Sequence, residues 1–168
     1  MRLFFLALCC SAALFGEAFP PLVLYTLRSE KKALPNGEKG LIFMGWRSEA
    51  REALSQWYHA LRSKKGIARR LTLTVVPIFP PCLSYAISRV PLMALLRTTI
   101  PERFSGNIGV LFSTVEETAA LFRRPKEDFS DLQTFLVDEE GSILWQTKGA
   151  PTAQSLQLLD SALAGSAI

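Results

Sequence analysis

The sequence is poor in the residues that bind metals and carry out thiol chemistry. Among its 168 residues, His59 is the only histidine, and the three cysteines form no Cys-x-x-Cys pair. A structural zinc site needs four Cys or His ligands, and a dithiol oxidoreductase needs two cysteines at that spacing. We therefore expect neither a metal nor another cofactor, and no dithiol chemistry.

Motifs for other chemistries are missing as well. The chain has no G-x-S-x-G hydrolase motif and neither of the glycine-rich phosphate-binding motifs. The acidic residues 138–140 precede Gly141, which is typical of a solvated turn rather than of paired catalytic carboxylates. His59 lies two positions beyond the apolar residue Trp57 in a predicted helix, so we expect it at the surface.

The charge balance is only slightly basic. The 19 Lys and Arg against 15 Asp and Glu give a net charge of +4 and a pI of about 9.1. This bias suits an anionic surface, but it is weaker than that of a dedicated nucleic-acid-binding protein, so we expect no nucleic-acid partner. Hydrophobic residues make up 49% of the chain, enough for a buried core in one domain.

The N-terminus is typical of a secretory signal peptide. Arg2 is followed by the 13-residue apolar run Leu3–Phe15, which is shorter than the roughly 20 residues of a transmembrane helix. Gly16 and Ala18 flank Glu17 as an A-x-A-like cleavage site. We expect cleavage after Ala18 and export to the periplasm or cell envelope, with an uncleaved membrane anchor as the alternative.

Removal of residues 1–18 leaves one domain, residues 19–168, in which Cys82 is the only thiol. No internal disulfide can then form, even in an oxidising compartment. Cys82 follows two prolines near a predicted short helix, whose dipole could activate it. The alternative is a buried cysteine that packs as a small hydrophobic residue.

The hydrophobic pattern predicts strands and helices in alternation. We expect strands at 22–27, 41–46, 71–79, 107–112, 134–138 and 142–146. We expect helices from 48 to before 66, at 84–90 and 92–98, from 114 to about 123 and from about 152 onward. Residues 31–37 predict a turn. This order predicts an α/β fold, a central mixed β-sheet with helices on both faces.

The loop after strand 41–46 and the terminal hairpin followed by a helix resemble the thioredoxin fold, over nearly all of the mature sequence. In redox-active relatives, the Trp that ends this strand is followed by Cys-x-x-Cys, because a helix N-terminus favours the thiolate. Here Trp46 is followed by Arg-Ser-Glu-Ala at 47–50, and Gln133-Thr134 stands where the family has a proline. The resemblance implies a thioredoxin-like protein without the Cys-x-x-Cys motif.

A weaker resemblance is to the mitochondrial ATP synthase assembly factor family, thioredoxin-like chaperones for a membrane subunit of that enzyme. The similar residues are Leu96-Arg97, Ile100-Pro101-Glu102-Arg103, Phe135-Leu136-Val137-Asp138, Ile143, Trp145 and Gly149. Leu144 stands where that family usually has Arg. This resemblance implies an assembly role, whereas bacterial periplasmic thioredoxin-like proteins share the hairpin and agree better with a signal peptide.

Two segments are candidates for partner contact. One is basic and contains Arg62, Lys64, Lys65, Arg69 and Arg70, which predicts either a solvated loop or contact with an anionic membrane surface. The other, residues 80–96, is more apolar than a connection needs, and is either core or a partner surface to which Met93 contributes an adaptable contact.

We therefore expect an exported, redox-inactive thioredoxin-fold protein that serves as a binding or assembly module for an envelope or membrane protein. The expected contact residues are Trp46, Arg47, Lys64, Lys65 and Met93. The alternative is an enzyme, a single-cysteine thiol reductase or peroxidase in which Cys82 is the nucleophile and an external thiol is the donor.

Overall fold

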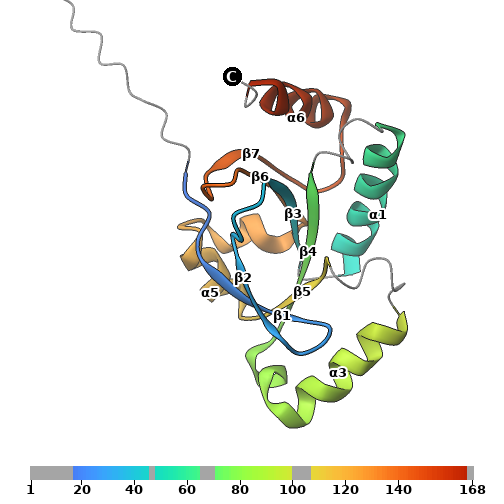
Figure 1. The fold of residues 1–168 in the computed structure, drawn as a ribbon, viewed down its shortest axis with the longest axis vertical. Helices are drawn as coiled ribbons and strands as arrows, with labels where there is room; N and C mark the ends of the chain where they lie inside the picture. Colours follow the sequence, from blue (N-terminus) through green and yellow to red (C-terminus); the bar gives the residue numbers. More distant parts are fainter. Residues whose placement is uncertain (1–16, 46–47, 65–70, 100–106, 166–168) are drawn as a thin grey trace, which may run out of the picture.

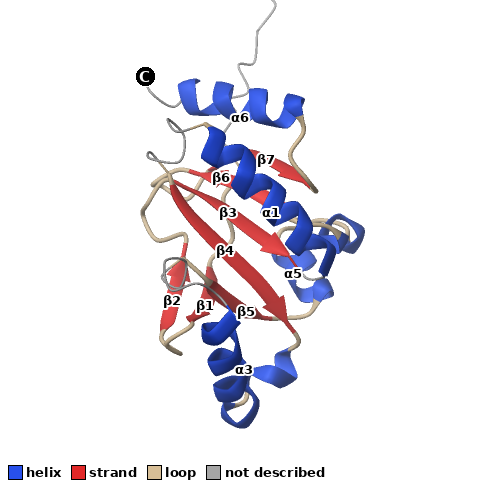
Figure 2. Cartoon of the chain, turned by 90° about the vertical axis from the view of Figure 1, so that its right-hand side faces the viewer, coloured by secondary structure: helices blue, strands red, loops and turns tan. Residues whose placement is uncertain are grey.

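The strands form a single mixed sheet with helices on both of its faces (Figures 1 and 2). The computed structural model describes residues 17–45, 48–64, 71–99 and 107–165. The seven strands lie in the order β2-β1-β5-β4-β3-β6-β7. They are β1 (Leu22–Thr26), β2 (Lys31–Leu34), β3 (Gly40–Gly45), β4 (Thr72–Phe79), β5 (Gly109–Phe112), β6 (Gln133–Val137) and β7 (Ile143–Lys148). The predicted α/β class with a central mixed sheet is confirmed.

The centre of the sheet is parallel and its flanks are antiparallel. β3 pairs in parallel with β4, and β4 with β5, whereas β6 and β7 on one side and β1 and β2 on the other run antiparallel to their neighbours. Strand β3 is the most apolar and its residues 41–44 are all buried. Strands of this kind are covered on both faces, and this places β3 at the centre of the core.

The helices connect these strands and cover the sheet. They are α1 (Ser48–Ser63), α3 (Ala86–Thr99), α5 (Val115–Leu121) and α6 (Ala153–Gly165), with 3-10 turns η1 (Pro81–Ser84) and η2 (Lys126–Ser130). Helix α5 begins with a capping box, in which Thr114 and Glu117 each bind the other's backbone N–H. None of the described helices is long and apolar enough to cross a membrane.

The core is divided between the two faces of the sheet. On one face, α1 and α6 cover β3 and β6, with Trp57 fully buried among them. On the other face, α5 and η2 pack an aromatic cluster in which the ring centroids of Phe122 and Phe135 lie 5.1 Å apart. A smaller cluster joins α3 to the β5 side through Met93 and Val110. Helices α1 and α5 thus lie on opposite sides of the sheet (Figure 1).

Two local predictions are wrong. Residues 31–34 were expected in a turn, but they form β2, the edge strand that pairs with β1. Lys31 and Lys32 have low strand propensity, and the pairing overrides it; lysine on an edge strand also discourages aggregation. Residues 86–99 form one helix rather than two short ones, with Pro91 inside it. Proline removes only one backbone hydrogen bond, and the burial of Met93 keeps the following turn packed on the sheet.

Residues around the expected cleavage point pack against the β6–β7 hairpin. The carbonyl oxygen of Glu17 accepts a 2.8 Å hydrogen bond from the backbone N–H of Ile143, and Ala18 forms an isolated bridge with Ser142. Phe19 is buried in the aromatic cluster. Residues 1–16 lie outside the described residues, and cleavage after Ala18 stays a prediction.

Candidate functional site

The junction between β3 and α1 is the first candidate site. Strand β3 ends at Gly45 and α1 begins at Ser48, whereas Trp46 and Arg47, both expected to contact a partner, lie outside the described residues. Ala50 is buried, and a Cβ at Gly45 would lie only 2.6 Å from the Ala50 Cβ. The first turn of α1 therefore packs closely onto the end of β3, and at residue 50 it places a methyl group there instead of a thiol.

Cys82 lies near the same edge of the sheet. Because β3 and β4 are parallel and Gly45 is aligned with Pro77, both strands end at this edge, and Cys82 follows β4 in the turn η1. The expectation that Cys82 is buried as a small hydrophobic residue is wrong, since it is exposed and free. The turn η1 contains no charged residue and is one turn long, so it provides neither a basic neighbour nor the dipole of a full helix.

Gln133 occupies the start of β6, where thioredoxins carry a proline. It pairs with Met44 at the end of β3 and is 4% exposed. Its side-chain amide donates a hydrogen bond to the carbonyl oxygen of Asp128 in η2. Gln133 thus fixes the neighbouring 3-10 turn, a structural role in the interior.

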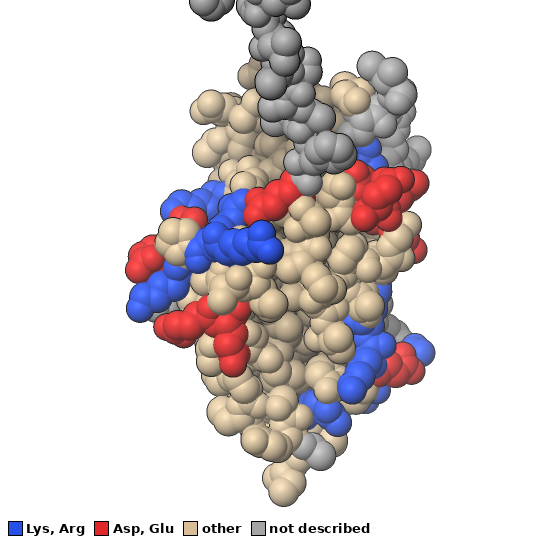
Figure 3. Space-filling view, turned by 90° about the vertical axis from the view of Figure 1, so that its left-hand side faces the viewer, with Lys and Arg blue, Asp and Glu red and all other residues tan. Residues whose placement is uncertain are grey.

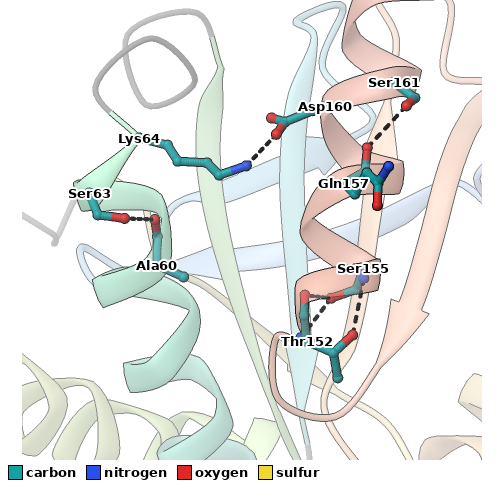
Figure 4. Close-up of polar contacts among 8 residues, drawn as sticks. All are labelled: Ala60, Ser63, Lys64, Thr152, Ser155, Gln157, Asp160 and Ser161. Carbon is teal, nitrogen blue, oxygen red and sulfur yellow. Dashed lines mark hydrogen bonds and ion pairs between the residues drawn. The ribbon is translucent and has the colours of Figure 1, made fainter.

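The described part of the basic segment is partly neutralised. Lys64, at the end of α1, forms an ion pair with Asp160 on α6 (Figure 4). Its side chain is 35% exposed, so Lys64 holds the two helices together rather than pointing freely into solvent. Arg62 is exposed, and Lys65, together with residues 69 and 70, lies outside the described residues.

Met93 does not lie on a surface. It is 1% exposed and packs with Leu27 and Val110 under α3, so the prediction that it contacts a partner is wrong. The exposed apolar residues of this region include Tyr85 and Ile87, at 72% and 91% exposure. Sequence reasoning placed both in the candidate segment 80–96 and did not single them out as its exposed members. Helical spacing gave only a partial signal, because positions 87 and 93 lie roughly 120° apart around one continuous helix.

The titratable residues build no further site in the part that the structure describes. His59 is exposed, as predicted, and no group of three or more His, Cys, Asp or Glu residues there could hold a metal ion. The pKa of Glu117 is lowered, chiefly because the backbone N–H of Thr114 donates to its carboxylate. This perturbation belongs to the capping box of α5 and stabilises the start of that helix.

Comparisons with known proteins give a fold and no family. No protein-family model and no curated protein matches the sequence. A solved thio-disulfide isomerase from Thermus thermophilus matches with a TM-score of 0.54 and 18% identity, over 89% of this chain and 94% of its own. The chain has a thioredoxin-like fold.

Two further thioredoxin-like structures agree. BsSco, a member of the Sco family of cytochrome c oxidase assembly proteins, matches with a TM-score of 0.56 and 12% identity, over 91% of this chain and 95% of its own. A thiol peroxidase from Chromobacterium violaceum matches with a TM-score of 0.51 and 14% identity, over 90% of this chain and 87% of its own. Identities this low establish the shared fold and leave the activity to be argued from the residues.

Proposed function

We propose that the protein is an exported, redox-inactive thioredoxin-fold module that binds and helps to assemble a protein of the cell envelope. The observation that carries the proposal is the β3–α1 junction. Residues 47–50 hold no cysteine there, and buried Ala50 packs against Gly45. Dithiol chemistry is therefore impossible at this junction, and we assign the scaffold a binding role.

The location and the partner class are supported by the leader and by the fold. The predicted signal peptide directs the protein to the envelope. Among the solved neighbours, BsSco belongs to a family named for cytochrome c oxidase assembly, and a pneumococcal neighbour is named an exposed lipoprotein thioredoxin. With the resemblance to ATP synthase assembly factors, they favour an envelope or membrane protein as partner, contacted through Trp46 and Arg47.

The inactivity of the β3–α1 junction can be tested by introducing cysteines at positions 47 and 50. We expect the wild-type protein to show no dithiol reduction of insulin, and Arg47→Cys/Ala50→Cys to gain it. The matched control is Arg47→Cys alone, which has one sulfur at the junction and stays inactive. Insulin reduction by the wild-type protein would contradict the proposal, and its loss in Cys82→Ser would assign the activity to Cys82.

A test of binding is crosslinking in envelope extracts. We expect the wild-type protein to capture a specific membrane or envelope protein and Arg47→Glu to lose it. Arg51→Glu is the matched control, because Arg51 is exposed on α1 and the substitution changes charge equally. If Arg47→Glu and Arg51→Glu capture the same partners as the wild-type protein, the assigned surface is wrong.

The exposure of Cys82 favours one alternative, a thiol peroxidase or reductase. In the peroxidase form, the Cys82 thiolate attacks a peroxide oxygen, becomes a sulfenic acid and releases water or an alcohol. One external thiol then condenses with the sulfenic acid to give a mixed disulfide and water. A second external thiol attacks this mixed disulfide, which releases the Cys82 thiolate and a disulfide of the two donor thiols. Peroxide consumption with a thiol donor that disappears in Cys82→Ser would establish this enzyme and exclude the binding module.

A further inference from the structure

Helix α3 presents an apolar face to solvent. Ile87 is 91% exposed, Val90 is 58% exposed and Leu95 is 60% exposed. Pro91 and Ala94 are also exposed. In an ordinary surface helix the side away from the core is polar, so this arrangement is the reverse of the usual one. Exposed apolar patches of this kind mark sites that contact a partner or a membrane.

Most of the exposed apolar residues of α3 lie on one side of the helix. At helical spacing, positions 87, 90, 91 and 94 fall on one face, and Met93, which is buried on the sheet, lies roughly 120° around the helix from Ile87. Tyr85, 72% exposed, comes immediately before the helix. Tyrosine is favoured at membrane interfaces because its ring is apolar and its hydroxyl is polar. We call Tyr85, Ile87, Val90, Pro91 and Ala94 the α3 outer face.

The charge around the α3 outer face is positive. Residues 80–99 contain Arg89 and Arg97 and no acidic residue. The Nε of Arg97 donates a hydrogen bond to the carbonyl oxygen of Leu27, which brings the exposed Arg28 beside the helix. Arg89 points toward the sheet instead, where its guanidinium lies 4.7 Å from the ring centroid of Tyr25 on β1. Arg97 and Arg28 are therefore the arginines that border the α3 outer face.

The neighbouring turn between β1 and β2 adds to this charge. It contains one acidic residue, Glu30, next to Lys31 and Lys32 of β2. With Arg28, the four charged residues 28, 30, 31 and 32 give three positive charges and one negative. The border of the α3 outer face is therefore positive on this side as well.

The position of α3 suits a flat partner. The helix lies at one end of the molecule, beyond the sheet (Figures 1 and 2). The lower end in Figure 3 is mostly uncharged, and Lys and Arg side chains, with acidic ones among them, lie beside it. A convex helix with an apolar outer face and basic borders has the properties of helices that lie in the lipid headgroup region.

We propose that the α3 outer face docks on an anionic lipid surface. The apolar side chains enter the headgroup region, and the arginines around them contact the anionic headgroups. A second copy of this chain fits less well, because it would bring the same arginines together without an acidic residue in 80–99 to pair with them. This inference goes beyond the proposed function and does not depend on the reactivity of Cys82.

The experiment needs a local readout, since the apolar run Leu3–Phe15 would bring any variant to a membrane. Cys82 provides one because it is exposed in η1, three residues before Tyr85. In the full chain with Cys9→Ser/Cys10→Ser, Cys82 is labelled with a polarity-sensitive fluorophore. The labelled protein is titrated with phosphatidylcholine vesicles, either pure or with about one third phosphatidylglycerol.

We expect a blue shift with the anionic vesicles that is weak or missing with pure phosphatidylcholine. Ile87→Glu/Val90→Glu should weaken the binding that this shift reports by about tenfold or more, because each substitution removes an apolar contact and adds a negative charge. The matched control is Leu121→Glu/Leu158→Glu, at 47% and 50% exposure on α5 and α6, which makes the same charge change elsewhere. This control should bind as the wild-type protein does.

Three results would overturn the proposal. They are equal shifts with and without the anionic lipid, equal binding by the Ile87→Glu/Val90→Glu and Leu121→Glu/Leu158→Glu variants, or no shift at all. Light scattering without lipid provides a fourth refuting result. If the wild-type protein is a dimer and Ile87→Glu/Val90→Glu is a monomer, the α3 outer face joins two copies of the chain instead of binding lipid. None of these results depends on dithiol activity. A failure of this proposal can therefore be distinguished from a failure of the proposed function.

Discussion

The indole Nε1 of Trp57 donates a 2.9 Å hydrogen bond to the carbonyl oxygen of Gly149, 92 residues away in the sequence. The bond connects the middle of α1 to the loop between β7 and α6. Trp57 is fully buried, and its ring also packs edge-on against Trp145 at 6.0 Å between centroids. These contacts hold α1 against the β6–β7 hairpin, on the face of the sheet that α1 and α6 cover.

Trp57→Phe should therefore destabilise the fold. It removes the hydrogen bond and leaves a carbonyl group without its donor, at a cost of about 1–3 kcal/mol in the free energy of unfolding. Trp145→Phe is the control, since Trp145 is half-buried and its substitution leaves the Gly149 bond intact. Urea unfolding followed by circular dichroism measures both variants, and an equal loss in the two would show that the hydrogen bond contributes nothing.

The burial of Met93 and the exposure of Ile87 can be compared within one helix. Met93→Ala should cost about 2–5 kcal/mol, because it leaves a cavity under α3. Ile87→Ala should change the unfolding free energy by less than about 0.5 kcal/mol, since its side chain is already in water. Thermal or urea unfolding of the two variants checks this, and comparable losses would mean that α3 packs with a different face inward.

The capping box of α5 predicts a pH-dependent contribution to stability. Because the pKa of Glu117 is lower in the folded state, its contribution is fully present above the ordinary glutamate pKa. It is lost as the pH falls through the lowered folded-state value. Glu117→Gln should thus destabilise the protein at neutral pH and have less effect in acid, whereas Glu116→Gln, outside the capping box, should show no such difference. Urea unfolding at several pH values would refute the assignment if the effect of Glu117→Gln were the same at each.

The ion pair between Lys64 and Asp160 predicts a small coupling energy. Both side chains are partly exposed, at 35% and 45%, so a double-mutant cycle with Lys64→Ala and Asp160→Ala should give at most about 1 kcal/mol. Salt should reduce this energy, because mobile ions screen exposed pairs. A coupling energy unchanged by salt would indicate that the two residues interact through packing instead.

Local patterns predicted those parts of the molecule in which a few neighbouring residues suffice. The continuous apolar residues of β3 indicated a strand, and the helix predicted from 114 agrees with the start of α5. The lack of cysteine at 47–50 also needed no structure, since it is a property of the sequence alone. Each of these inferences depends on residues within one or two turns of each other.

Residues whose environment depends on distant parts of the chain were predicted less well. Lys31–Leu34 became a strand because β1 pairs with it, and its own propensity gave no such indication. For Cys82 and Met93 the sequence left both burial and exposure open, and the structure exposes Cys82 and buries Met93. Whether an apolar residue of 80–96 is covered depends on how α3 rotates against β5, and apolar residues occur on more than one side of the helix.

The sequence by itself determined most of the order of strands and helices, with β2 missed and α3 divided in two, and it shows that residues 47–50 contain no dithiol. Only the tertiary structure decided that Met93 turns inward, Ile87 outward, and Lys64 toward Asp160. The physical reason is that backbone propensities and caps act between near neighbours, whereas burial and ion pairing need a partner surface, which forms only when remote segments pack together.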